Sequence, residues 1–274
     1  MSRSYCFKNL LLFLIAVLAF SLSSVAQGQT PVCTNANCWK YSGATGPENW
    51  ATLTPFALCS QANSPTQQSP INIASATQNA SLPQIHFSYS PKNVPVENNG
   101  HTIEADYAGI KENSISYNGT TYDLLQFHFH SPSEHTIAGS GYPMELHLVH
   151  QAENGAMLVI AVWLNPKDNE RNAALQKVLD NIPTPPAAHG EAHGLNAGAL
   201  LPNQSNINKN NYYTYTGSLT TPPCSAGITW LALTMPLTIA QSQLEAFQKY
   251  YSNNARPVQP ASQHLNLQQS KIPQ

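Results

Sequence analysis

Charged side chains are scarce in this chain of 274 residues: Asp, Glu, Lys and Arg make up only 9% of it, and the formal net charge is −2. A nearly neutral chain offers no basic surface for nucleic acid or for an acidic membrane, so neither partner is expected. The sequence also lacks internal repeats and, after its N-terminus, any composition shift that would mark a second domain. These absences predict one domain that owes its solubility to Asn, Gln, Ser and Thr.

The longest apolar run, Leu10–Phe20, is too short for a membrane span, which needs about 20 residues. It follows the basic residues Arg3 and Lys8 and precedes Ser-Val-Ala, the small-x-small pattern of a cleavage site. We therefore expect residues 1–26 to be a signal peptide and residues 27–274 to be an exported protein, periplasmic or secreted, without a stable membrane span. A membrane anchor is the minority alternative.

Four cysteines follow the expected signal peptide: Cys33, Cys38, Cys59 and Cys224. An even number in an exported protein favours disulfides, although four cysteines allow three pairings. We favour Cys59–Cys224 together with Cys33–Cys38. The second pair would either staple the N-terminus or link two subunits of a homodimer. A cysteine zinc site is the weaker alternative, because histidines offer a better one.

Strand patterns outnumber helical patterns along the chain. Strands are expected at Ile85–Tyr89, Thr102–Ala105, Ile115–Tyr117 and Met157–Leu164, with helices at Asn169–Asn181 and Gln241–Tyr250. The Pro-, Ala- and Gly-rich stretch Pro183–Leu201 is expected to be a long surface loop. The fold class is therefore mainly β with short helices, in a single domain.

Three histidines lie in the stretch from Gln126 to His150 (QFHFHSPSEHTIAGSGYPMELHLVH). Side chains alternate across a β-strand, so QFHFH places His128 and His130 on one face and its two Phe rings on the other. ELHLVH repeats the pattern after a turn, which allows His147 to lie on a neighbouring strand. Three imidazoles with no fourth ligand from Cys or a carboxylate indicate an open, catalytic type of zinc site. The alternative, packed or surface histidines, explains one such residue better than three.

Two polar residues have the right spacing to orient these histidines. Gln126 and Glu145 each lie two positions before a proposed ligand and hence on its face of the strand. A metal-binding imidazole usually donates its second N–H to an amide, carboxylate or carbonyl. We therefore expect Gln126 to orient His128 and Glu145 to orient His147.

Several motifs together resemble the α-class carbonic anhydrase family. They are QSPINI, NNGH, QFHFH, SEHT, ELHLVH, GSLTTPPC with Thr229-Trp230, and Asn254-Ala255-Arg256-Pro257, in the order in which the family has them. The resemblance covers the chain from Trp39 to about Pro260. It implies a central, twisted, largely antiparallel β-sheet and one Zn²⁺ per chain, bound by His128, His130 and His147. The implied reaction is the reversible hydration of carbon dioxide to bicarbonate and a proton, with zinc hydroxide as the nucleophile.

The resemblance also implies roles for other residues. Thr220 would donate a hydrogen bond to Glu134 and so orient the hydroxide, and His101 would shuttle the proton to solvent. The remaining assignments are a bicarbonate contact at Thr221, an apolar carbon dioxide pocket at Val149, Val159, Leu219 and Trp230, and supporting contacts from Tyr41 and from the Asn254 carbonyl to His130.

Two other classes of function stay open on the sequence alone. One is a catalytically silent, carbonic-anhydrase-like binding module, although such members usually lack a ligand histidine and this chain has all three. The other is a zinc esterase or related hydrolase. A zinc peptidase would need a base such as the Glu of H-E-x-x-H, and that motif is absent from the sequence.

Overall fold

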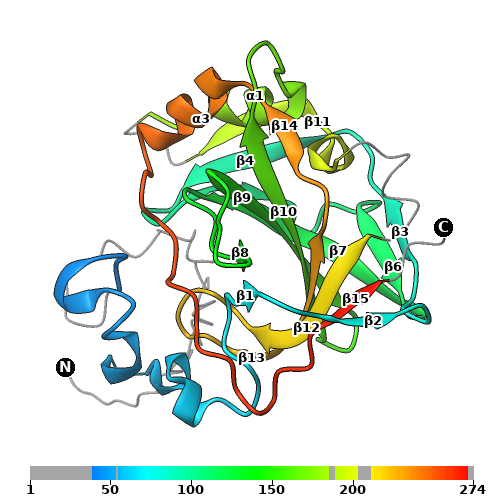
Figure 1. Ribbon diagram of the computed structural model, residues 1–274. Helices are drawn as coiled ribbons and strands as arrows, with labels where there is room; N and C mark the ends of the chain where they lie inside the picture. The colour runs from blue at the N-terminus through cyan, green and yellow to red at the C-terminus, as the bar shows by residue number, and fades with distance from the viewer. Residues whose placement is uncertain (1–38, 54, 185–188, 203–210, 271–274) are drawn as a thin grey trace, which may run out of the picture. The chain divides into compact units, whose positions relative to one another are not determined.

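The computed structural model describes residues 39–53, 55–184, 189–202 and 211–270, and a large β-sheet dominates them (Figure 1). The strands are β1 Asn72–Ile73, β2 Thr77–Asn79, β3 Ile85–Ser88, β4 Lys92–Asn98, β5 Ile103–Asp106, β6 Ser114–Tyr117, β7 Thr120–His130, β8 Thr136–Ile137, β9 Met144–Ala152, β10 Met157–Pro166, β11 Gly190–Leu195, β12 Tyr212–Ser218, β13 Ala226–Leu233, β14 Leu237–Ile239 and β15 Gln268–Ser270. The α-helices are α1 Ala173–Asp180 and α3 Gln241–Gln248, and short 3₁₀ helices lie at Gly43–Thr45, Trp50–Thr52, Ala57–Cys59, Gln61–Asn63 and Ala197–Leu200.

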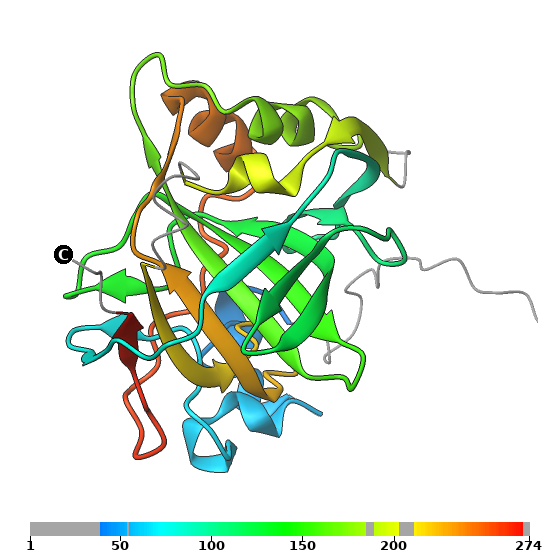
Figure 2. The ribbon, with the colours of Figure 1, turned by 90° about the vertical axis from the view of Figure 1, so that its right-hand side faces the viewer.

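Thirteen of the described strands form one sheet, whose main order is β11-β4-β5-β7-β9-β10-β13-β12-β15-β2. Most neighbours pair antiparallel, including β5 with β7 and β7 with β9. The exceptions include β10, which pairs in parallel with β13. The predicted fold class, mainly β around a largely antiparallel sheet, is confirmed, with a parallel pair near the centre. Figure 2 shows the twist of these strands from the side.

The two long strands β7 and β9 bring the histidine motifs together. Their register places His128 directly opposite His147. The register shifts between Leu124 and Gln126, where β7 carries an extra residue. This β-bulge explains why Leu124 and Phe127, three positions apart, both face the large core instead of opposite sides. The alternation predicted for QFHFH holds beyond the bulge.

Each face of the sheet carries its own apolar cluster. The larger cluster includes Phe127, Phe129, Leu146 and Leu148, which alternate with the histidines along β7 and β9. A smaller cluster on the histidine face includes Val149, Val159 and Trp230. Strands covered on both faces explain why β10 reads as a continuous apolar run in the sequence.

Helices α1 and α3 lie side by side at one end of the sheet (Figure 1). Helix α1 begins at Ala173, later than predicted, because the Asn172 side chain accepts a hydrogen bond from the Leu175 N–H and caps the helix. Gln243 of α3 donates to the Asn172 carbonyl at 2.8 Å and joins the two helices. The two predicted helices are confirmed with shorter bounds.

The prediction of a loop over Pro183–Leu201 is wrong for its second half. Strand β11 pairs antiparallel with β4, and Ala192 and Leu195 are buried in the large core. The Gly and His residues between them obscured a short edge strand in the sequence. The expected signal peptide and the Cys33–Cys38 pair lie outside the described residues. Within the described part of the chain, no helix has the length and apolar character that crossing a membrane requires.

Candidate metal centre and active site

The side chains of His128, His130 and His147 converge on the sheet. Each offers a ring nitrogen, and these three nitrogens lie within 4.8 Å of one another. The rings of His130 and His147 are 4.7 Å apart between centroids. His130 Nε2 is fully buried and has no hydrogen-bond partner, which is costly for a polar atom unless a ligand satisfies it. The arrangement fits a metal bound by three imidazoles.

The other ring nitrogen of each histidine makes a hydrogen bond to an acceptor. His128 Nδ1 lies 2.7 Å from Gln126 Oε1, and His147 Nε2 lies 2.9 Å from Glu145 Oε1. His130 Nδ1 lies 2.7 Å from the Asn254 carbonyl oxygen. These acceptors fix Nε2 of His128, Nε2 of His130 and Nδ1 of His147 as the nitrogens with free lone pairs. The contacts expected from Gln126, Glu145 and Asn254 are all present.

Burial favours the neutral, metal-binding form of two of the three imidazoles. It lowers the pKa of His128 well below its usual value and also lowers that of His130. Burial alone would raise the pKa of Glu145, but the neighbouring His135 and His147 outweigh it and hold that pKa well below its usual range. Neutral His128 and His130 imidazoles and an ionised Glu145 carboxylate are therefore the favoured forms of these three groups.

The hydrogen bond expected between Thr220 and Glu134 is not formed. Both residues are buried, but Glu134 Oε2 has no hydrogen-bond partner. Its other oxygen, Oε1, accepts from the Arg256 backbone N–H at 2.8 Å. Oε2 lies 3.8 Å from His147 Nδ1, so the free oxygen of this carboxylate adjoins the candidate metal site. This oxygen is a free hydrogen-bond acceptor, and the family resemblance predicts Thr220 as its donor.

One side of the site is apolar. Val149, Val159 and Trp230 lie directly opposite one another on β9, β10 and β13, and Leu219 packs against the cluster they belong to. The Trp230 ring lies 4.8 Å from the His147 ring. The four residues predicted to form a pocket wall therefore belong to one cluster that contacts a ligand histidine.

The aromatic N-terminal segment covers the position of His101. The His101 ring stacks on Trp39 at 3.6 Å between centroids, and burial lowers the His101 pKa. Tyr41 packs edge-on against both Trp39 and Trp50. Burial raises the Tyr41 pKa well above its usual value, and the charge of Glu134 raises it further.

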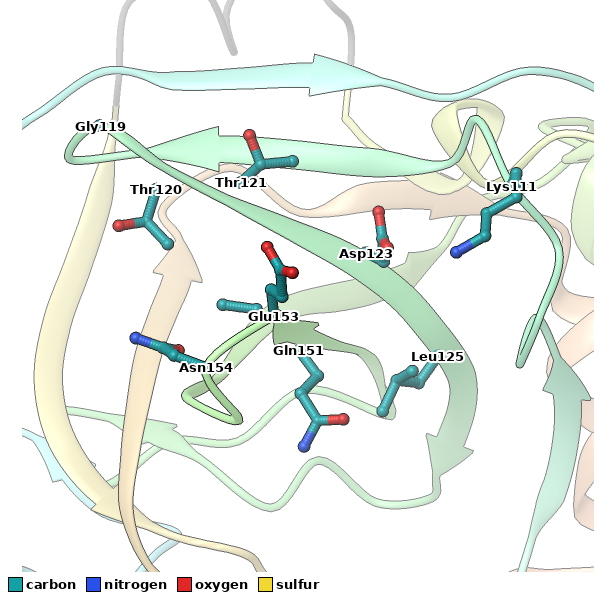
Figure 3. A pocket seen from close by; sticks show the side chains of 10 residues that line it. Lys111, Gly119, Thr120, Thr121, Asp123, Leu125, Gln151, Glu153 and Asn154 are labelled. Atoms are coloured by element: carbon teal, nitrogen blue, oxygen red, sulfur yellow. The ribbon is translucent and has the colours of Figure 1, made fainter.

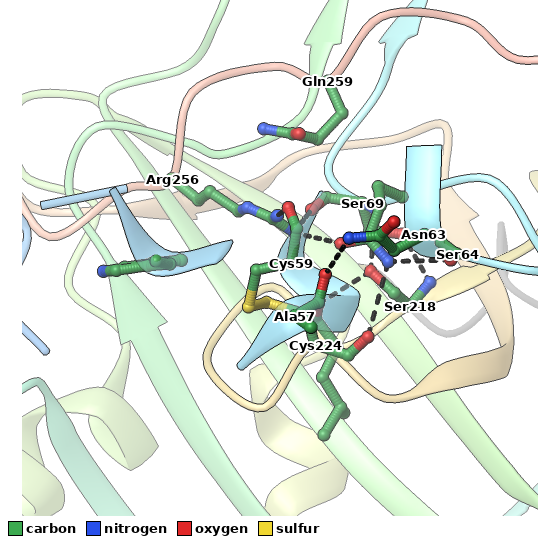
Figure 4. The surroundings of a disulfide bond; sticks show 12 residues. Ala57, Cys59, Asn63, Ser64, Ser69, Ser218, Cys224, Arg256 and Gln259 are labelled. Carbon is green, nitrogen blue, oxygen red and sulfur yellow. Dashed lines mark hydrogen bonds between the residues drawn. A yellow bond between two sulfur atoms is a disulfide. The ribbon is translucent and has the colours of Figure 1, made fainter. Parts of the chain in front are cut away.

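The segment after β12, with Thr220 and Thr221, is tied down by a disulfide. The predicted Cys59–Cys224 bond is formed, with its Cα atoms 5.0 Å apart. Figure 4 shows Arg256 beside this bond, where its guanidinium donates to the Cys59 carbonyl at 2.7 Å. The Thr221 carbonyl in turn accepts from the Cys224 N–H at 2.8 Å. A covalent bond and a buried arginine thus hold the segment.

Sequence reasoning missed Glu104. It lies on β5, opposite both Glu97 on β4 and His128 on β7. Burial, followed by the charges of Glu97 and Asp106, raises its pKa to about 7. The alternation in Ile103–Asp106, with the two apolar residues in the large core, was the signal that places Glu104 on the histidine face.

An open hollow of ≈ 930 Å³ lies elsewhere, over the start of β7 and the end of β9. Figure 3 shows Asp123, Gln151 and Glu153 around it, with Lys111 at one side. None of the three histidines lines this hollow, so it is distinct from the candidate metal centre.

Comparison with known proteins agrees with this geometry. Residues 45–269 match the family model described as eukaryotic-type carbonic anhydrase. The chain is 39% identical over 257 residues to a carbonic anhydrase of Neisseria gonorrhoeae, which covers 93% of this chain and 94% of that protein. Its fold is similar to that of an α-carbonic anhydrase from Thermovibrio ammonificans in complex with the inhibitor sulfanilamide, with a TM-score of 0.74, 36% identity, and coverage of 85% of this chain and 99% of the other. It is also similar to a dioscorin in complex with ascorbate, with a TM-score of 0.76, 26% identity, and coverage of 86% and 98%. The chain therefore belongs to the eukaryotic-type (α) carbonic anhydrase family, whose general reaction is the hydration of carbon dioxide.

Proposed function

We propose that this chain catalyses the zinc-dependent, reversible hydration of carbon dioxide to bicarbonate and a proton. The observation that carries the proposal is the unpartnered, fully buried Nε2 of His130, within 4.8 Å of the ligand nitrogens of His128 and His147. The donor set of three imidazoles suits Zn²⁺. His128, His130 and His147 would hold Zn²⁺, which would supply a water acidic enough to serve as a nucleophile near neutral pH; carbonic anhydrases are the standard example.

Glu134 and Thr220 are proposed to control hydrogen-bond direction at the centre. An ionised carboxylate only accepts hydrogen bonds, so a Thr220 hydroxyl that turned toward the free Oε2 of Glu134 would have a single direction for its proton. The threonine oxygen would then keep its lone pairs free to accept a hydrogen bond from the reacting water. The free Oε2, 3.8 Å from a ligand nitrogen, supports this assignment.

The apolar cluster is proposed to hold the substrate. Carbon dioxide is small and uncharged, and the wall of Val149, Val159, Leu219 and Trp230 excludes water where it would bind. Thr221, next to the threonine that orients the nucleophile, is assigned to contact the bicarbonate product. A weak activity on activated esters is expected from the same nucleophile.

The site of action is proposed to lie outside the cytoplasm, in the periplasm or beyond the cell. The formed Cys59–Cys224 bond supports this proposal, because disulfides persist in oxidising compartments. The signal peptide and a homodimer linked through Cys33 or Cys38 remain predictions.

Metal removal tests the function directly. Carbon dioxide hydration by the mature protein is expected to disappear after chelation and to return with added Zn²⁺, whereas His130→Ala is expected not to recover. A folded, zinc-loaded protein without hydration would overturn the proposal. In that case, remaining activity on activated esters would indicate a zinc esterase, and no activity would indicate a catalytically silent binding module.

The proposed proton shuttle has its own test. His101→Ala is expected to lower turnover in weak buffer by roughly 10-fold or more, because export of the proton then depends on solvent alone. Added imidazole is expected to restore the rate. His193→Ala, at an exposed position on β11, is the matched control and should have no effect. Unchanged turnover of His101→Ala in weak buffer would contradict the assignment.

A further inference from the structure

A chain of buried hydrogen bonds continues beyond Glu145, away from the metal centre. Glu145 Oε1 accepts from His147 Nε2 and also from His135 Nδ1, at 2.9 and 2.7 Å. Its Oε2 accepts from the backbone N–H groups of Glu134 and His135 at 2.7 and 2.9 Å. With four donors, Glu145 is a fully satisfied acceptor, and the proton of each histidine lies on the nitrogen that faces it.

The other ring nitrogen of His135 continues this chain of hydrogen bonds. His135 Nε2 lies 2.7 Å from the Tyr215 hydroxyl oxygen. That oxygen in turn lies 2.8 Å from Ser69 Oγ. Ser69 Oγ also accepts from the Ser218 N–H at 3.1 Å. Hydrogen bonds thus connect Ser69 without a break to the carboxylate of Glu145.

The far end of this chain of hydrogen bonds lies in the segment that carries Thr220. Ser69 N–H donates back to Ser218 Oγ at 3.0 Å, so the two serines form a closed pair, which Figure 4 places beside the disulfide. The Ser218 carbonyl also accepts from Trp230 Nε1 at 2.9 Å. Gly217 lies so close to Ser69 and Tyr215 that a Cβ on it would collide with Ser69 Oγ and the Tyr215 ring. The backbone is therefore fitted to this junction.

We propose that Tyr215 is a positioning residue for the metal centre. Its hydroxyl acts through His135 and Glu145 to fix the orientation and tautomer of His147, and through Ser69 it ties that ligand to the segment Ser218–Thr221. Tyr215 is buried, and its ring stacks on Trp230 at 6.3 Å between centroids. Water therefore does not replace His135 or Ser69 as the hydrogen-bond partner of its hydroxyl. This inference rests on the proposed function only in that His147 binds Zn²⁺.

The test compares Tyr215→Phe with Tyr212→Phe. Both variants lose one buried phenolic hydroxyl from strand β12, but Tyr212 faces the large core and donates to the Pro83 carbonyl at 2.6 Å. The two apo proteins are expected to lose similar stability. Zinc affinity, measured by competition with a chelator, is expected to fall about 10-fold in Tyr215→Phe, as is usual for partners behind a ligand, and to stay unchanged in Tyr212→Phe.

Nitrogen-15 shifts of the His147 ring in the apo protein give a readout that needs no metal. The wild type is expected to show the tautomer protonated at Nε2, and Tyr215→Phe a mixture. Equal zinc affinity and equal ring shifts in the two variants would overturn the inference. If Tyr215→Phe does not fold, Ser69→Ala, which removes the hydroxyl bonded to Tyr215 but no ring, carries the same comparison. A wild type that binds no zinc would instead refute the proposed function.

Discussion

Removal of the Cys59–Cys224 disulfide is expected to lower the free energy of unfolding by roughly 5 kcal/mol in the chain-entropy model. The bond closes a loop with a sequence separation of 165 residues, and a long closed loop constrains the unfolded chain strongly. A loss of this size is comparable with the whole stability of many domains. The double variant Cys59→Ser/Cys224→Ser should therefore unfold at a much lower urea concentration than the wild type.

In urea, the Cys59→Ser/Cys224→Ser variant should lose carbon dioxide hydration at a lower concentration than the one at which it unfolds. Cys224 lies four residues after Thr220, which is proposed to orient the nucleophile. Arg256 donates to the Cys59 carbonyl on the other side of the disulfide, so the disulfide holds the Thr220 segment in place. The control is Cys33→Ser/Cys38→Ser, whose expected bond would close a much shorter loop and contribute less. Urea midpoints that do not differ between wild type and Cys59→Ser/Cys224→Ser would contradict this prediction.

The ligand histidines and their partners could be predicted from the sequence because period-2 alternation is a local property. His128 and His130 share a face with Gln126 whatever the remainder of the fold does, and the register of β7 with β9 then brings in His147. The three acceptors expected for the outer nitrogens all make their hydrogen bonds. Local spacing thus specified much of the centre.

Contacts between distant segments could not be predicted in this way. Glu104 adjoins the centre only through pairing of β5 with β7, and no spacing within its own strand gives that register. The link from Tyr215 to His135 spans 80 positions in the sequence, and the link to Ser69 spans 146. Strand β11 was missed because its core contacts come from Ala192 and Leu195, two residues in a stretch rich in Gly and His.

His150 shows how the same strand carries a different histidine on its other face. It lies opposite Leu124 on β7 and Leu158 on β10, within the large core, and it is fully buried. Its Nε2 lies 2.6 Å from the Tyr89 hydroxyl. Burial lowers the His150 pKa from its usual 6.5 to about 3. Between about pH 3 and pH 6.5 the imidazole therefore stays neutral in the folded protein, whereas the unfolded chain has already bound a proton.

This pKa shift predicts a loss of stability in acid. The unfolded chain protonates His150 below about pH 6.5 and the folded chain only near pH 3, so each pH unit between these values should cost about 1.4 kcal/mol. The total approaches roughly 5 kcal/mol, and the effect vanishes above pH 6.5 because both states are then neutral.

His150→Gln, which keeps an acceptor for Tyr89 but cannot titrate, should lose less stability on acidification. His193→Gln on the exposed face of β11 should follow the wild type, and since all three proteins share the same carboxylates, the difference between their urea midpoints isolates His150. Parallel curves for wild type and His150→Gln from pH 7 to pH 4 would show that His150 does not carry this acid sensitivity.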